Sequence, residues 1–197
     1  MSVEVIISYD GTPNDDDALA LGKMLARGGL TLALAYVRHS REFDPRREEL
    51  AQHDADQRLE RGAALLGDPD ITRRVVFGSD YRTSPGHVEP GTSAQHLLDG
   101  GSVAVAIAAA GLRTQLDGAI KSIAVPVAGP ENEAARKTAA SLAAKLGATV
   151  LESPSEPADL IVVGSAPGAP AGRIVVGGDV RSELDRARGS VLVLPAG

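Results

Sequence analysis

The chain has 197 residues, of which 43% are apolar and 23% are charged, and this is the composition of a globular protein. Aromatic residues make up only 3% and Trp is absent, so a surface that stacks nucleic acid bases is not expected. A net charge of −6 argues against a DNA-binding protein, which needs a basic face. The absence of Cys excludes disulfides, thiolate chemistry and Cys-ligated zinc.

The N-terminus has no basic stretch ahead of a long apolar run, so no signal peptide is expected. The longest apolar run covers residues 103–112, which is too short to span a bilayer. We therefore expect a soluble, acidic, cytoplasmic protein with no membrane partner.

The chain opens with a strand, helix, strand pattern. Residues 3–9 are apolar on both faces, which is typical of a buried parallel strand. Thr12 is the expected N-cap of the following helix and Pro13 its first residue, with the carboxylates of Asp15–Asp17 solvated in the first turn. Gly28 ends this helix, and residues 30–37 form the next strand.

Further elements are expected in the same alternation. In the rest of the first half they are a helix at 45–66, a strand at 72–77, a loop at 78–91, a short helix at 92–98 and a strand at 102–108. In the second half they are strands at 121–127, 148–151, 159–163 and 190–194, with helices at 132–146 and 181–187.

The two halves of the sequence align with each other. The segment IISYDGTPNDDDAL matches AVPVAGPENEAARK, and RVVFGS matches LIVVGS. The spacing from Gly78 to Gly91 equals that from Gly164 to Gly177. A tandem repeat is the simplest account, with lobes at 1–112 and 120–197. One continuous doubly wound sheet, whose halves look alike because all α/β proteins share these patterns, is the alternative.

These residues resemble the universal stress protein family over nearly the whole chain. Tyr9-Asp10-Gly11-Thr12 is similar to the end of that family's first strand, and ADLIVVGS at 158–165 is similar to the strand before its nucleotide motif. The motif reads Gly, two residues, Gly, nine residues, Gly, then Ser or Thr. The resemblance implies two Rossmann-like lobes, each a mostly parallel open sheet with flanking helices. They would pair about a pseudo-twofold axis through 102–108 and 190–196, as an intramolecular pseudo-dimer that could itself form a homodimer.

The resemblance places a site for ATP or AMP in the first lobe. Its residues there would be Asp10 on the nucleoside, with Gly78, Gly91, Thr92 and Ser93 on the phosphates. Tyr81 replaces the motif's second glycine, which narrows the approach to the phosphates.

The second copy departs further from the motif. It has Pro167 in place of the motif's second Gly, Gly178 in place of Ser or Thr, and Ala128 in place of Asp. Its glycine loop therefore reads as structural.

Simpler interpretations of these residues remain open. Asp10 can be a turn residue, and Thr92 a plain N-cap. Asp15–Asp17 lack the alternating ligands of a calcium loop, so no metal site is expected. Arg38 and its neighbouring arginines are expected to pair with acids such as Glu48 on the surface.

We expect no catalytic residues, and the leading function is a non-enzymatic regulatory protein of the cytoplasmic stress response that binds an adenine nucleotide. The first alternative is an interaction or scaffold module that has lost the nucleotide site and acts on an unknown protein partner. The second is an enzyme that hydrolyses nucleotides, although no general acid–base pair stands out.

Overall fold

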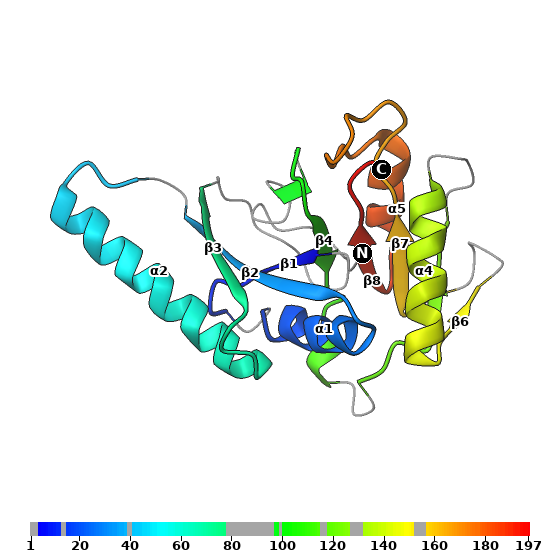
Figure 1. Cartoon of the computed structure of the whole chain (residues 1–197), viewed down its shortest axis with the longest axis horizontal. Helices are drawn as coiled ribbons and strands as arrows, with labels where there is room; N and C mark the ends of the chain where they lie inside the picture. The colour runs from blue at the N-terminus through cyan, green and yellow to red at the C-terminus, as the bar shows by residue number, and fades with distance from the viewer. Residues whose placement is uncertain are drawn as a thin grey trace.

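The computed structural model describes residues 4–12, 15–38, 41–77, 97–98, 100–114, 118–126, 132–151 and 157–197. Their strands form one continuous eight-stranded sheet (Figure 1). The strands are β1 (Glu4–Ser8), β2 (Thr31–Arg38), β3 (Thr72–Phe77), β4 (Ala104–Ile107), β5 (Ser122–Ala124), β6 (Thr149–Val150), β7 (Leu160–Val163) and β8 (Ser190–Val193). The helices are α1 (Asp15–Arg27), α2 (Pro45–Leu66), α4 (Glu133–Leu146) and α5 (Gly178–Arg186), with a 3-10 turn η1 (Leu112–Thr114).

The sheet has the strand order β3-β2-β1-β4-β8-β7-β5-β6. Neighbouring strands are parallel except β4 and β8, which pair antiparallel with Val105 opposite Val193 and Ile107 opposite Val191. The expected mostly parallel α/β architecture is confirmed, and the last strands of the two halves meet as expected. The two-lobe tandem repeat stays a prediction. Because the direction reverses at β4, the carboxyl ends of the first-half strands and of the second-half strands lie at opposite edges.

The sequence match between RVVFGS and LIVVGS does not reflect equivalent places in the sheet. The first segment contains β3, which pairs with β2 at the outer edge. The second contains β7, which lies between β5 and β8. The aligned strands are similar because both are apolar and both end at a glycine, and these properties do not determine which strand is the neighbour.

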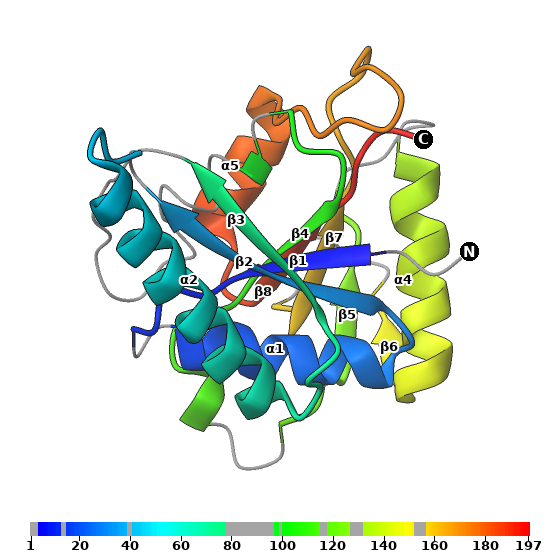
Figure 2. The ribbon, with the colours of Figure 1, turned by 60° about the vertical axis from the view of Figure 1, so that its left-hand side comes forward.

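Both faces of the central strands are buried, as expected for a parallel sheet. Ile7 packs in a cluster with Leu19 of α1 and Leu59 of α2, whereas its neighbour Ile6 packs with Leu184 of α5. The side chains alternate along the strand, so α1 and α2 cover one face and α5 the other (Figure 2). α4 lies on the α1 side, where its residues join the cluster that contains Leu21.

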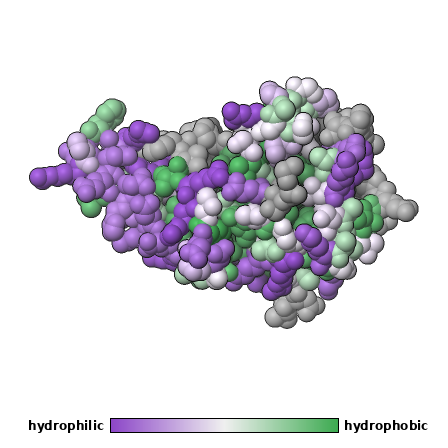
Figure 3. Space-filling model, viewed as in Figure 1, coloured by the Kyte–Doolittle hydropathy of each residue, from purple (hydrophilic) through white to green (hydrophobic). Residues whose placement is uncertain are grey.

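α2 is long and polar, and its surface is hydrophilic in Figure 3. Asp44 caps it by accepting hydrogen bonds from the backbone N–H groups of Arg46 and Arg47. Gly67 ends it in the left-handed conformation, with φ of 79°. No helix within the described ranges is both long enough and apolar enough to cross a membrane.

Candidate functional site

The carboxyl ends of β1 and β4 form a topological switch point. The chain passes from β1 to β2 on one side, while β4 flanks β1 on the other. Open α/β sheets bind ligands in the crevice outside such a point. The segment 10–12 follows β1 and the segment 108–111 follows β4, so the structure places Asp10 at the edge where the sequence predicts a ligand site.

The loop after β1 is closed by a buried carboxylate from α1. Asp15 Oδ2 accepts hydrogen bonds from the backbone N–H of Asp10 at 3.0 Å, the backbone N–H of Thr12 at 2.6 Å and the Thr12 hydroxyl at 3.0 Å. The Asp15 side chain is only 9% exposed. Its burial raises the pKa of Asp15 above the usual value, and the hydrogen bonds from Thr12 and Asp10 offset only part of that rise.

The segment after β4 is tied to the same turn of α1. Asp17, which is 4% exposed, accepts hydrogen bonds from the backbone N–H of Gly111 at 2.8 Å and of Arg113 at 2.7 Å. The Arg113 guanidinium adds a third bond at 3.0 Å. Both loops of the switch point are therefore fixed by first-turn carboxylates of α1.

The expectation of a solvated helix start is wrong for Asp15 and Asp17 and holds only for Asp16, which is exposed. The expected N-cap at Thr12 stays a prediction, because residues 13 and 14 lie outside the described residues. Thr12 donates its backbone N–H and its hydroxyl to the Asp15 carboxylate. Acids in a first helical turn are common for dipole reasons. The sequence shows that Asp15 and Asp17 stand on either side of Asp16, but it does not show which loops these two carboxylates hold.

Two arginines near this edge, Arg58 and Arg38, already make hydrogen bonds within the protein. Arg58 of α2 donates to the backbone carbonyl of Asp10 at 2.9 Å, and its guanidinium lies 5.2 Å from the centre of the Tyr36 ring. Arg38, at the end of β2, is 5% exposed and bonds both oxygens of Glu48, at 2.9 and 2.7 Å. The expected pairing of Arg38 with Glu48 is thus confirmed, but the expected surface position is wrong for Arg38, which is buried. The hydrogen bonds from Arg38 lower the pKa of Glu48.

Gly78, Gly91, Thr92 and Ser93 lie outside the described residues. The position of the preceding strand is nevertheless informative, because β3 ends at Phe77 with β2 between it and β1. Two strand spacings separate β3 from β1, about 10 Å. β3 therefore ends two strands away from β1, which leads to Asp10.

The second-half glycine loop follows β7 and is held by internal hydrogen bonds. Gly164 donates its backbone N–H to the buried Asn132 side chain at 3.1 Å. Ser165 Oγ donates to the carbonyl of Leu194 at 2.9 Å, and the backbone N–H of Ile174 donates to Gly101 O at 2.7 Å. These contacts support the structural interpretation of the loop.

Within the part of the chain that the structure describes, no group of three or more His, Asp or Glu side chains is arranged to hold a metal ion. The polar groups at the switch point accept and donate hydrogen bonds within the protein.

Comparisons with known proteins link the chain to solved structures. No protein-family model matches the sequence, and no curated protein matches it. A universal stress protein from Archaeoglobus fulgidus DSM 4304 is similar in structure over 98% of both chains, with a TM-score of 0.72 and 13% identity. A functionally unknown protein from Pseudomonas aeruginosa PAO1 has a TM-score of 0.56 and 12% identity, over 98% of this chain and 92% of the other. At such low identity the likeness concerns the fold.

Proposed function

We propose that this chain, which has the universal stress protein fold, is a non-enzymatic regulatory protein of the cytoplasm that acts by binding a partner protein. In this proposal the edge of the sheet at the carboxyl ends of β1 and β4 does not bind the phosphates of a nucleotide. The antiparallel pairing of β4 with β8 supports a second part of the proposal. In it, residues 1–112 and 120–197 are two related lobes that form an intramolecular pseudo-dimer.

One observation carries the loss of phosphate binding. The backbone N–H groups of Asp10 and Thr12, together with the Thr12 hydroxyl, all donate to Asp15 Oδ2. Loops between a strand and a helix bind anions through such donors. Here the anion is a carboxylate of the protein itself, so a phosphate would have to displace a covalently tethered competitor.

The charge of the edge supports the same conclusion. Asp10, Asp15, Asp16 and Asp17 lie within one loop and one helical turn. The Arg113 guanidinium already bonds Asp17, and the Arg58 guanidinium is bound to the Asp10 carbonyl. A triphosphate would therefore meet four carboxylates, only partly offset by the positive charges of Arg58 and Arg113, and this disfavours its binding.

A nucleotide-binding regulator is the second candidate, because Asp10 lies at the switch point between β1 and β4. Gly11 adds to this case, since it has φ of +82° and a Cβ built there meets no atom within 4 Å, so there is open space beside it. In this candidate ATP or AMP binds through Asp10, with Gly78, Gly91, Thr92 and Ser93 as the predicted phosphate residues. Slow hydrolysis of that nucleotide would be its enzymatic extension.

Thermal melts with ATP, AMP and Mg²⁺ separate the two candidates. A ligand at 100 times its dissociation constant adds about 2.7 kcal/mol to the free energy of unfolding, and this raises the melting temperature by several degrees. Our proposal predicts no shift at millimolar nucleotide. A shift in the wild type that Asp10→Ala and Thr92→Val both lose would establish the nucleotide-binding regulator instead. Asp16→Asn, at an exposed neighbouring position, is the matched control and should behave as the wild type.

A further inference from the structure

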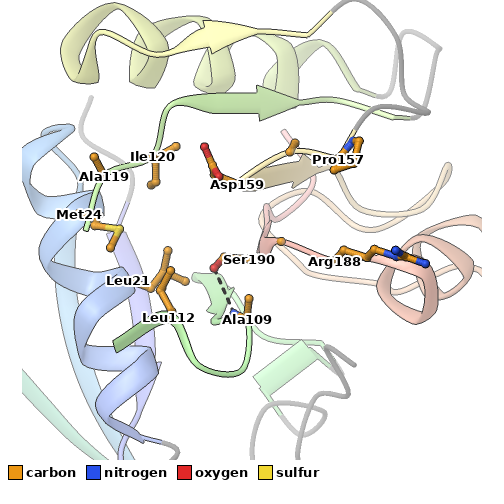
Figure 4. Close-up of a pocket in the computed structure, with 12 residues that line it drawn as sticks. Leu21, Met24, Ala109, Leu112, Ala119, Ile120, Pro157, Asp159, Arg188 and Ser190 are labelled. Carbon is orange, nitrogen blue, oxygen red and sulfur yellow. Dashed lines mark hydrogen bonds between the residues drawn. The ribbon is translucent and has the colours of Figure 1, made fainter. Parts of the chain in front are cut away.

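A cavity of about 160 Å³ lies where the two halves of the chain meet (Figure 4). One part of its lining comes from α1 and from the segment after β4. The other part comes from the segments that precede β5, β7 and β8. The loop after β1, which holds Asp10, contributes no residue to the lining, although Ala109 of the segment after β4 does.

One end of the cavity is apolar. Leu21 and Met24 of α1 face Leu112 and Ile120 there, and each of these four side chains is less than 8% exposed. An apolar protein cavity of about 150 Å³ binds benzene. The whole cavity, with its polar side included, has about this volume, so a phenyl-sized group at the apolar end would occupy most of it.

Two polar side chains of the lining, Ser190 and Asp159, already accept hydrogen bonds from backbone N–H groups. Ser190 Oγ accepts a hydrogen bond from the backbone N–H of Ala109 at 3.1 Å, drawn as a dashed line in Figure 4. Asp159 Oδ2 accepts from the backbone N–H groups of Lys121 and Ser122 at 2.8 and 2.9 Å. These bonds hold the segments that enclose the cavity and compensate the Asp159 charge.

Arg188 is the positively charged residue of the cavity lining. Its side chain is exposed, and its guanidinium makes no hydrogen bond or ion pair with the rest of the described chain. Figure 4 shows it on the opposite side of the cavity from Leu21 and Met24, with its guanidinium pointing away from them. A guanidinium binds carboxylates through paired N–H groups. A carboxylate that projects from this side of the cavity can therefore meet the guanidinium.

We propose that this cavity binds a small amphipathic acid. An apolar group of about phenyl size packs against Leu21, Met24, Leu112 and Ile120, and a carboxylate bonds the Arg188 guanidinium. Because both halves of the chain contact such a ligand, its binding stabilises their junction and raises the melting temperature. This site goes beyond the proposed function and does not depend on whether a nucleotide binds at Asp10.

The test uses 3-phenylpropanoate as the probe and 3-phenylpropan-1-ol as its neutral counterpart. Both are titrated into the full chain while the methyl NMR signals of Leu21, Met24, Leu112 and Ile120 are followed. We expect saturable shifts at these four methyl-bearing residues with both probes. The acid should bind about fivefold more tightly than the alcohol, which is the upper end of the contribution of an exposed ion pair.

Three variants assign the binding to the cavity. Arg188→Gln should remove the preference for the acid and leave binding of the alcohol unchanged. Arg186→Gln, an exposed arginine outside the lining, should keep that preference. Ala119→Leu, at an exposed lining position, should narrow the opening and weaken both probes. The proposal is overturned if neither probe gives saturable shifts, if Arg188→Gln leaves the preference intact, or if Ala119→Leu leaves both affinities unchanged.

Discussion

Asp17 accepts hydrogen bonds from both the backbone N–H and the guanidinium of Arg113, 96 residues further along the chain. The contact joins the first turn of α1 to the segment that leads from β4 into the second half. Asp15, two residues before Asp17, likewise holds the loop after β1 by accepting hydrogen bonds from its backbone N–H groups. The shape of the switch point therefore depends on two buried carboxylates of one helical turn.

Replacement of Asp17 should destabilise the protein. Asp17→Ala leaves the backbone N–H groups of Gly111 and Arg113 without their acceptor. We expect the free energy of unfolding to fall by about 2–4 kcal/mol, measured by urea denaturation. Asp16→Ala, at the exposed position between the two buried acids, should change it by no more than about 0.5 kcal/mol. Equal losses in the two variants would contradict the role assigned to Asp17.

The buried Asp15 carboxylate should give stability a distinctive pH dependence. Because burial raises its pKa in the folded state, the folded protein binds more protons than the unfolded chain between the two pKa values. The contribution of Asp15 to stability is therefore greatest at low pH and falls as pH rises from about 4 through the raised pKa.

Asp15→Asn removes the titrating group, and its amide oxygen, with two lone pairs, can keep two of the three hydrogen bonds that now reach Asp15 Oδ2. The difference in unfolding free energy, variant minus wild type, should grow with pH by at most about 1.4 kcal/mol per unit and then level off. Denaturation at a series of pH values measures it. A difference that shrinks as pH rises would show that the hydrogen bonds outweigh burial.

Gly189, just before β8, has no room for a side chain. A Cβ at this position would collide with the backbone carbonyl oxygen of Ala158, which cannot move as a side chain can. Gly189→Ala should therefore lower the unfolding free energy by more than about 2 kcal/mol. Gly178→Ala, at the start of α5, meets nothing within 4 Å and should be neutral or slightly stabilising. Thermal melts that rank the two variants in the reverse order would show that the β7–β8 junction adjusts easily.

The second half should not fold independently. In the whole chain β8 pairs with β4, and Leu142 of α4 shares a core cluster with Leu21 and Leu25 of α1. A fragment of residues 120–197 loses both contacts and exposes β8 as an edge strand. We expect it to show no cooperative thermal transition as a monomer. A sharp, monomeric melt, checked by light scattering, would establish an autonomous domain.

Elements with a strong local pattern could be predicted from the sequence. The long charged helix was predicted at 45–66 and observed at Pro45–Leu66, because Asp44 and Gly67 mark its ends. The C-terminal helix was predicted from 181 but begins at Gly178, since glycines give no helical signal there.

The candidate site was harder to predict because it depends on which strands are neighbours. A glycine after a strand has the same local pattern wherever that strand lies, and so Gly78 and Gly164 were matched although β3 and β7 occupy different places. The burial of Asp15 and Asp17 likewise arises from loops distant in sequence. The placement of Asp10 was predictable, because the end of a first parallel strand always lies at the carboxyl edge.

Amide NMR spectra of the loop after β1, recorded during a titration with ATP and Mg²⁺, show directly whether a phosphate reaches this loop. In the structure it is the Asp15 carboxylate that accepts the hydrogen bond from the Thr12 backbone N–H. We expect the Asp10, Gly11 and Thr12 amide signals to stay in place at millimolar ATP, and Asp15→Asn to shift them without any ligand. Saturable movement of these signals with ATP in the wild type, absent in Asp10→Ala, would contradict this expectation.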